Sequence, residues 1–103
     1  MKEYPMKVKG FIRAGIPAEN KDEPPKVGLF NEKEKKFYRL NEVALYIWDL
    51  CDGSHSIEDI SKMLLDEVKK SSHPKAKTAT LNEIKKDVEY IVERLKKFGL
   101  IKQ

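Results

Sequence analysis

The feature that most constrains the fold is a set of three helix-start signals in the second half of the chain. In each, a side-chain oxygen can accept from the free amides of a first helical turn, and apolar residues follow at helical spacing. The starts are Asn41 and two capping-box patterns, Ser56-Ile57-Glu58-Asp59 and Thr80-Leu81-Asn82-Glu83. Gly53 and Gly99 stand where the first and third segments end, and glycine favours a helix stop. The sequence therefore predicts helices over about 41–51, 56–68 and 80–98.

Each predicted helix carries an apolar face, so the three helices are expected to share one core. The faces comprise Val43, Ala44, Ile47, Trp48 and Cys51; Ile57, Ile60, Met63, Leu64 and Val68; and Leu81, Ile84, Val88, Ile91, Val92, Leu95 and Phe98. After Gly99, Leu100 and Ile101 are expected to fold back as an apolar clasp. Residues 69–79, between the second and third helices, are expected to form a basic, polar loop.

The first forty residues indicate short β-strands instead. Residues 6–13 show a period of two, weakened by Gly10, and residues 14–25 hold prolines and acidic residues that are typical of a loop. Residues 26–30 and 36–40 flank a polar segment of hairpin-loop size, which predicts an antiparallel hairpin. The expected fold is therefore α+β and winged helix-turn-helix-like, with a three-stranded antiparallel sheet followed by three helices.

Length and composition limit the class of protein. A chain of 103 residues has room for one domain, so we expect residues 1–103 to form a single unit. The content of 40% hydrophobic and 37% charged residues is typical of a soluble globular protein. The apolar run 43–48 is far shorter than the roughly 20 residues that cross a bilayer. With no apolar signal segment at the N-terminus, these features predict a cytoplasmic protein without a membrane partner.

The sequence offers no constellation typical of catalysis or metal binding. His55 and His73 fall in predicted loops without a second ligand at metal-binding spacing, and Cys51, the single cysteine, lies on a predicted buried face. Neither a Gly-rich phosphate loop nor a nucleophile elbow is present in the sequence. We therefore expect no catalytic residues, no metal site and no cofactor in this chain.

Nucleic-acid binding remains an alternative, since a winged helix can place a recognition helix in the major groove. The net charge of +4 is mild, and the last predicted helix alternates acidic and basic residues. Four lysines do cluster, at positions 69, 70, 75 and 77, but they lie in a predicted loop. Our first interpretation is therefore a protein without a nucleic-acid partner. The alternative is a winged-helix transcriptional regulator that binds DNA.

Two features favour contact with a protein or peptide. Tyr46 and Tyr90 lie off the apolar faces of their helices, where they either pack on the surface or meet a partner. The segment Phe37-Tyr38-Arg39-Leu40 has apolar residues on both faces of a predicted strand. If one edge of that strand is open, it can pair with an extended peptide or with a second copy of the chain.

The segment from Leu40 to Ile60 resembles the PqqD-like family. It reads Leu-Asn-Glu-Val-Ala-Leu-Tyr-Ile-Trp-Asp-Leu-Cys-Asp-Gly-Ser-His-Ser-Ile-Glu-Asp-Ile. In that family a strand ends in Leu-Asn, a helix closes on Leu-Cys-Asp-Gly, and the next helix opens with Thr/Ser-x-x-Asp/Glu-Ile. The similarity continues through residues 88–95 to 99–101. It covers residues 26–101, which leaves 1–25 as a variable N-terminal strand and loop.

The resemblance implies a non-catalytic peptide chaperone or adaptor, the recognition element of a pathway that modifies ribosomally made peptides. Such a domain binds the leader of a precursor peptide as an added strand. It then presents the peptide to a modifying enzyme, often a radical SAM protein, to which the iron–sulfur cluster and SAM belong. The resemblance therefore implies no cofactor in this chain.

The family's peptide site, carried onto this sequence, involves a strand and one side of the last helix. The strand residues are Phe37, Tyr38, Arg39 and Leu40. The helix residues are Lys85, Val88 and Val92. The opposite flank of the helix, with Asp87, Ile91 and Arg94, stays open as an alternative because the sequence leaves the rotation of the helix undefined.

Overall fold

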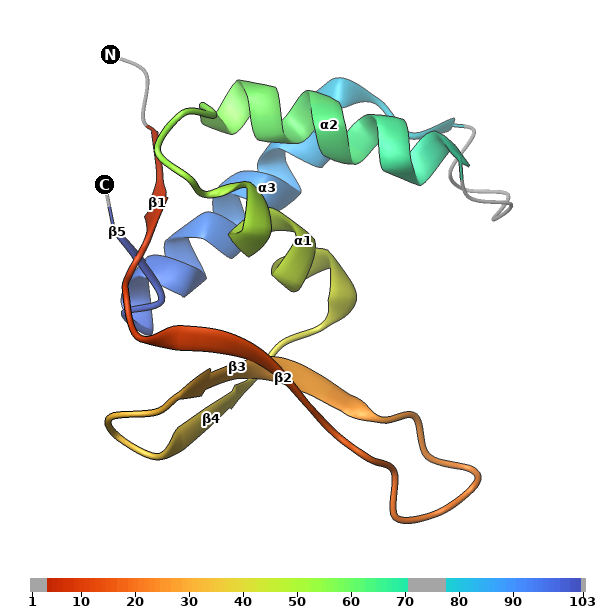
Figure 1. Cartoon of the computed structure of the whole chain (residues 1–103). Helices are drawn as coiled ribbons and strands as arrows, with labels where there is room; N and C mark the ends of the chain where they lie inside the picture. The colour runs from red at the N-terminus through yellow and green to blue at the C-terminus, as the bar shows by residue number, and fades with distance from the viewer. Residues whose placement is uncertain (1–3, 71–77, 103) are drawn as a thin grey trace.

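Three helices cover one face of a three-stranded sheet, and a small two-stranded sheet joins the two ends of the chain (Figure 1). The structure is a computed structural model that describes residues 4–70 and 78–102. Its elements are β1 (Met6–Lys7), β2 (Phe11–Ile16), β3 (Lys26–Asn31), β4 (Lys36–Arg39), α1 (Glu42–Leu50), α2 (Ile57–Lys70), α3 (Leu81–Lys97) and β5 (Ile101–Lys102). This is the predicted α+β, winged-helix-like arrangement of three strands followed by three helices.

The main sheet has the order β2-β3-β4, with both pairs antiparallel. Leu29 lies opposite Arg13 on one side and Tyr38 on the other. Opposite residues share a face of the sheet, and Leu29 is fully buried, so this face looks toward the helices. Arg13 reaches from the same face to Asp49 of α1, at 2.7 Å between Nη1 and Oδ2.

The prediction for the first strand is wrong in its bounds. Residues 6–13 do not form one strand, because the chain turns at Gly10, which has φ +100°. Met6–Lys7 pairs instead with β5, and β2 begins at Phe11. β2 extends to Ile16, which lies opposite Lys26, so the pairing with β3 converts the first residues of the predicted loop into strand.

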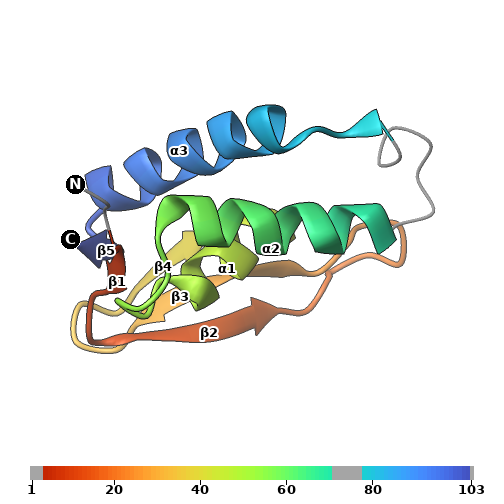
Figure 2. The ribbon, with the colours of Figure 1, turned by 90° about the horizontal axis from the view of Figure 1, so that it is seen from above.

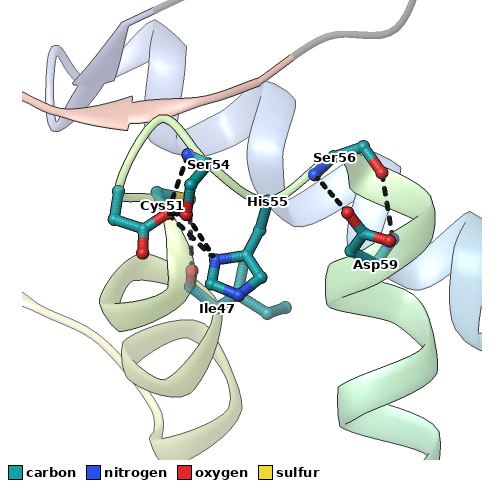
Figure 3. Close-up of polar contacts among 7 residues, drawn as sticks. Ile47, Cys51, Ser54, His55, Ser56 and Asp59 are labelled. Atoms are coloured by element: carbon teal, nitrogen blue, oxygen red, sulfur yellow. Dashed lines mark hydrogen bonds and ion pairs between the residues drawn. The ribbon is translucent and has the colours of Figure 1, made fainter.

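The three helix starts are confirmed. Oδ1 of Asn41 accepts from the Ala44 amide at 2.7 Å, and Oγ1 of Thr80 accepts from the Glu83 amide at 3.3 Å. The pair Ser56 and Asp59 is reciprocal, as drawn in Figure 3: each backbone N–H donates to the other side chain, at 3.2 and 3.1 Å. Gly53 and Gly99 follow the ends of α1 and α3 and have φ +82° and +76°, as expected for glycines at helix stops.

The core lies mainly among the three helices and the C-terminal segment, and Leu29 is its one buried member from the three-stranded sheet. Its buried members are Leu29, Leu45, Ile47, Trp48, Cys51, Ile60, Leu64, Ile84, Val88, Val92, Leu95, Leu100 and Ile101. The expected clasp is confirmed, because Leu100 and Ile101 are buried and β5 pairs with β1. The Leu100 carbonyl also accepts from Nε1 of Trp48, at 3.2 Å. The clasp therefore fixes the end of α3 against α1.

Between α2 and α3 the prediction is tested only in part. α2 continues to Lys70, so Lys69 and Lys70 of the basic cluster are helical. His73, Lys75 and Lys77 lie outside the described residues.

Candidate functional site

One edge of β4 carries no paired strand among the described residues. β4 is the last strand in the sheet order, with β3 on its inner side. Just past β4, the Leu40 amide donates to the Val27 carbonyl of β3 at 3.0 Å. Since inward and outward backbone groups alternate along an antiparallel strand, those of Phe37 and Arg39 are expected to point to the outer edge. This edge offers a short ladder of backbone donors and acceptors.

A cavity of about 320 Å³ separates the end of β4 from α3. It is lined by Arg39, Leu40, Asn41, Ala44, Tyr90, Ile91, Arg94, Leu95 and Phe98. Seen from above in Figure 2, α3 runs on the β4 side of the sheet, with β2 on the far side. The outer edge of β4 and the cavity thus lie together.

Two further hollows extend this cavity. One of about 430 Å³ lies beside Pro24 and Pro25 and shares Arg39, Leu40 and Asn41 with it. The other, of about 390 Å³, lies among α1, α2 and α3 and shares Asn41, Tyr90 and Ile91. We call the three together the β4–α3 groove. Its third hollow is mainly apolar, with Val43, Leu64, Val68 and Ile84 in its wall.

An aromatic and basic stripe along α3 borders the groove. Tyr90 and Phe98 are 62% and 49% exposed, the two highest values among the large hydrophobic side chains of the described residues. Arg94 lies between them in the sequence, with its guanidinium 5.7 Å from each ring centroid. Its Nη1 also donates to the Tyr90 hydroxyl at 3.1 Å. These contacts hold the Arg94 guanidinium on the groove side of the helix.

The two flanks of α3 differ in burial and in their position relative to the groove. Val88 and Val92 are 0% exposed core residues, so in this structure neither side chain offers a surface for a peptide to contact. The reason is the rotation of α3, which turns the stripe containing both valines inward. Lys85 is half-buried and is not among the residues lining the groove. The alternative flank borders the groove, with Ile91 and Arg94 in the central cavity and Asp87 in the third hollow.

The four strand residues divide by role. Arg39 and Leu40 line the central cavity. Tyr38 instead faces the helices, and its ring meets that of Phe11 edge-on at 5.7 Å. Phe37 lies opposite Phe30, on the face of the sheet turned away from the helices. Tyr38 is therefore a packing residue, and Phe37 contributes to the outer edge through its backbone.

Sequence reasoning missed part of the groove. Asn41 was identified only as a helix cap and Phe98 only as a core residue, yet both line the central cavity. The spacing of Tyr90, Arg94 and Phe98, four residues apart, places them on one stripe of a helix. This spacing is the sequence signal that could have indicated the α3 border of the groove. Tyr46 differs from Tyr90, since its hydroxyl donates to the Met63 carbonyl of α2 at 3.5 Å, as expected for surface packing.

The titratable groups near the α1–α2 turn are structural. Burial raises the pKa of the Cys51 thiol to about 11, and its Sγ donates to the Ile47 carbonyl at 3.1 Å (Figure 3). Hydrogen bonds from the hydroxyl and amide of Ser54, and then from His55, hold the pKa of the Asp52 carboxyl well below its usual range. The Asp52 contacts fix the turn, and burial keeps the Cys51 thiol protonated at neutral pH.

Two kinds of site are absent from the part of the chain that the structure describes. Residues 4–70 and 78–102 contain no group of three His, Cys, Asp or Glu side chains that could hold a metal ion. Within the same residues, none of the helices has the length and apolar character needed to span a bilayer.

Comparisons with known proteins identify a family and a similar fold. Residues 27–101 match the family described as "Coenzyme PQQ synthesis protein D (PqqD)". A solved structure described as "Lasso peptide synthetase B1 complexed with the leader peptide" has a similar fold, with a TM-score of 0.61 and 16% sequence identity. The similarity covers 98% of this chain and 100% of that chain. No match was found among curated proteins.

Proposed function

Because the chain belongs to the PqqD family, we propose that it binds the leader of a ribosomally made precursor peptide and presents it to a modifying enzyme. Domains of this family bind peptides and are non-catalytic. The protein of similar fold is described as complexed with a leader peptide, which supports the same class of ligand here. We also propose that residues 1–103 act as one peptide-binding domain.

The observation that carries the proposal is the open edge of β4 beside the groove. An extended peptide can add to such an edge through main-chain hydrogen bonds, while alternate side chains enter neighbouring pockets. At about 3.3 Å per residue, four peptide residues span roughly 13 Å and match the length of β4. Phe37 and Arg39 supply the backbone groups in this arrangement, and the α3 flank supplies the pockets.

The binding residues in this proposal follow from the groove. Phe37, Tyr38, Arg39 and Leu40 form the strand to which the peptide is added. On α3, Ile91 and Arg94 take the place of Val88 and Val92, which the core covers. Lys85 is no longer part of the site, and Tyr90 and Phe98 join it as exposed rings.

The partner in this proposal is a modifying enzyme, for which a radical SAM protein is our specific candidate. The adaptor performs no chemical step, because its role is to hold the peptide near the enzyme. Tethering of this kind raises the effective concentration of the peptide, to about millimolar for a short flexible linkage, so that modest affinities suffice.

A nuclear magnetic resonance titration tests the function. The labelled chain would be titrated with a synthetic leader peptide encoded by a precursor gene beside its own gene. We expect saturable shifts at the amides of residues 37–40 and 90–98. A dilution series without peptide would reveal self-association through the same edge.

A matched titration with a DNA duplex addresses the regulator alternative. Duplex binding that is saturable and falls steeply with salt, combined with no shift on addition of the leader, would overturn the proposal.

A further inference from the structure

The charges along the β4–α3 groove are unevenly distributed. Arg39 and Arg94 are the two charged residues that line the central cavity. The hollow beside the prolines adds one carboxylate, Glu42, and the hollow among the helices adds another, Asp87. The middle of the groove is therefore positive, and each end carries an acidic residue.

Neither arginine of the central cavity forms an ion pair with a carboxylate among the described residues. Other cations of the chain do: Arg13 pairs with Asp49, Lys62 with Glu58, Lys70 with Glu67 and Lys96 with Glu93. Arg94 instead contacts the Tyr90 hydroxyl and two aromatic rings, which leave its charge uncompensated.

The apolar wall of the central cavity strengthens the attraction of the Arg94 charge for an anionic group. The central cavity has Leu40, Ala44, Ile91 and Leu95 in its wall, so a group that enters it loses part of its contact with water. An electrostatic attraction is stronger in such surroundings than in bulk water. Arginine is well suited to bind a carboxylate, because its planar guanidinium can donate two parallel hydrogen bonds to one carboxylate.

We infer that the groove selects a peptide with an acidic side chain, Asp or Glu, at the position that faces Arg94, with Arg39 at the rim of the same cavity. The inference rests on the proposed function and specifies its ligand class. A carboxylate at that position would meet the Arg94 guanidinium while the peptide backbone pairs with β4. The side chain of Arg39 alternates with that of Tyr38 along the strand, so it adds positive charge at the rim of the groove. The acidic residues at the ends of the groove would disfavour a register in which the same carboxylate lay one hollow further along.

A displayed library of random twelve-residue peptides tests this inference without knowledge of the natural leader. The library would be selected against the unmodified chain and against the double variant Arg39→Gln/Arg94→Gln. A control double variant, Lys9→Gln/Lys86→Gln, removes two exposed positive charges outside the groove. We expect Asp or Glu to be enriched at one fixed position by the unmodified chain and by the control, but not by the groove variant.

Binding affinities measured with one selected peptide and its amide variant then give a double-mutant cycle. Exchange of its acidic residue for the matching amide should weaken binding at least tenfold to the unmodified chain and to the control. The same exchange should weaken binding less than twofold to the groove variant. A misfolded groove variant would be recognised by its amide spectrum, and the single variant Arg94→Lys would then replace it, with an intermediate loss expected.

The outcomes separate the inference from the proposed function. Selected peptides that shift the amides of β4 and α3 but show no acidic preference would overturn the inference and leave the function intact. Selected peptides that shift neither element would contradict both.

Discussion

Gly28 allows β4 to lie close to β3. A Cβ atom at this position would overlap the Tyr38 carbonyl oxygen and lie 3.0 Å from the Arg39 Cα. These are backbone atoms of β4, so they can move only with the strand. The side-chain-free position therefore lets β4 approach β3 as closely as it does.

We predict that Gly28→Ala destabilises the domain by about 1–3 kcal/mol, the usual cost of overpacking, and weakens leader binding. Gly15→Ala is the matched control, because a Cβ there meets only the Lys26 carbonyl oxygen at an ordinary 3.7 Å. Urea denaturation and peptide titration measure the two effects. Equal stability of the two variants would contradict this account of Gly28.

Cys51 gives a prediction about pH. Its pKa is raised to about 11 by burial, whereas a thiol in an unfolded chain titrates near 8.5. The unfolded state therefore loses its proton first as the pH rises, so the stabilising contribution is complete below about pH 8.5 and is lost toward pH 11.

Unfolding free energies of the chain and of Cys51→Ala, measured from pH 7 to 11, should converge as the pH rises. The lysines and tyrosines that also titrate in this range are common to both proteins, so they cancel in the difference. A difference that stays constant would show that the thiol titrates alike in both states.

At the scale of elements, the outer edge of β4 depends on backbone groups more than on side chains. Phe37→Pro removes an amide that is expected to point outward and leaves the ladder to β3 intact. Proline is tolerated at such edge positions. We predict about tenfold weaker leader binding, equivalent to 1.4 kcal/mol, with a change in stability below about 1 kcal/mol.

Phe37→Ala is the control for that variant, because it keeps the amide and removes a ring that lies on the face turned away from the helices. Its affinity for the leader should stay within about twofold of that of the unmodified chain. If Phe37→Ala weakened binding as much as Phe37→Pro does, the ring and not the backbone would be the contact. Isothermal titration calorimetry distinguishes the two cases.

The elements that sequence predicted best are those with local signals. Asn41, Ser56 and Thr80 each cap a helix through contacts three residues away, so the pattern is visible in a short window. The bounds of β2 depend on β3, which lies beyond a loop, and on the turn at Gly10. Such long-range pairing has no equivalent signal in the sequence.

The flank of α3 was unpredictable for a related reason. The apolar residues of this helix form one continuous stripe about 120° wide, with Val92 at one edge and Phe98 at the other. Periodicity alone therefore does not tell which of them face the core. The packing of α3 against α1 and α2 decides this, and it buries the two valines.

At the scale of the whole molecule, the two ends of the chain are joined on the side away from the C-terminal end of α2 (Figure 1). β1 pairs with β5, and Lys7 also lies over the Trp48 ring, 4.9 Å from its centroid. This closure supports the C-terminal end of α3, where Phe98 and Arg94 border the groove. The pairing of β1 with β5 therefore fixes the α3 side of the groove.

Amide hydrogen exchange, measured with and without a saturating leader peptide, tests strand addition most directly. In the free chain, the Tyr38 amide should be protected by β3, whereas the amides of Phe37 and Arg39 should exchange quickly. On peptide binding, the Phe37 and Arg39 amides should slow by at least tenfold, with Tyr38 little changed. Saturation with peptide that leaves the exchange of Phe37 and Arg39 unaltered would contradict the account.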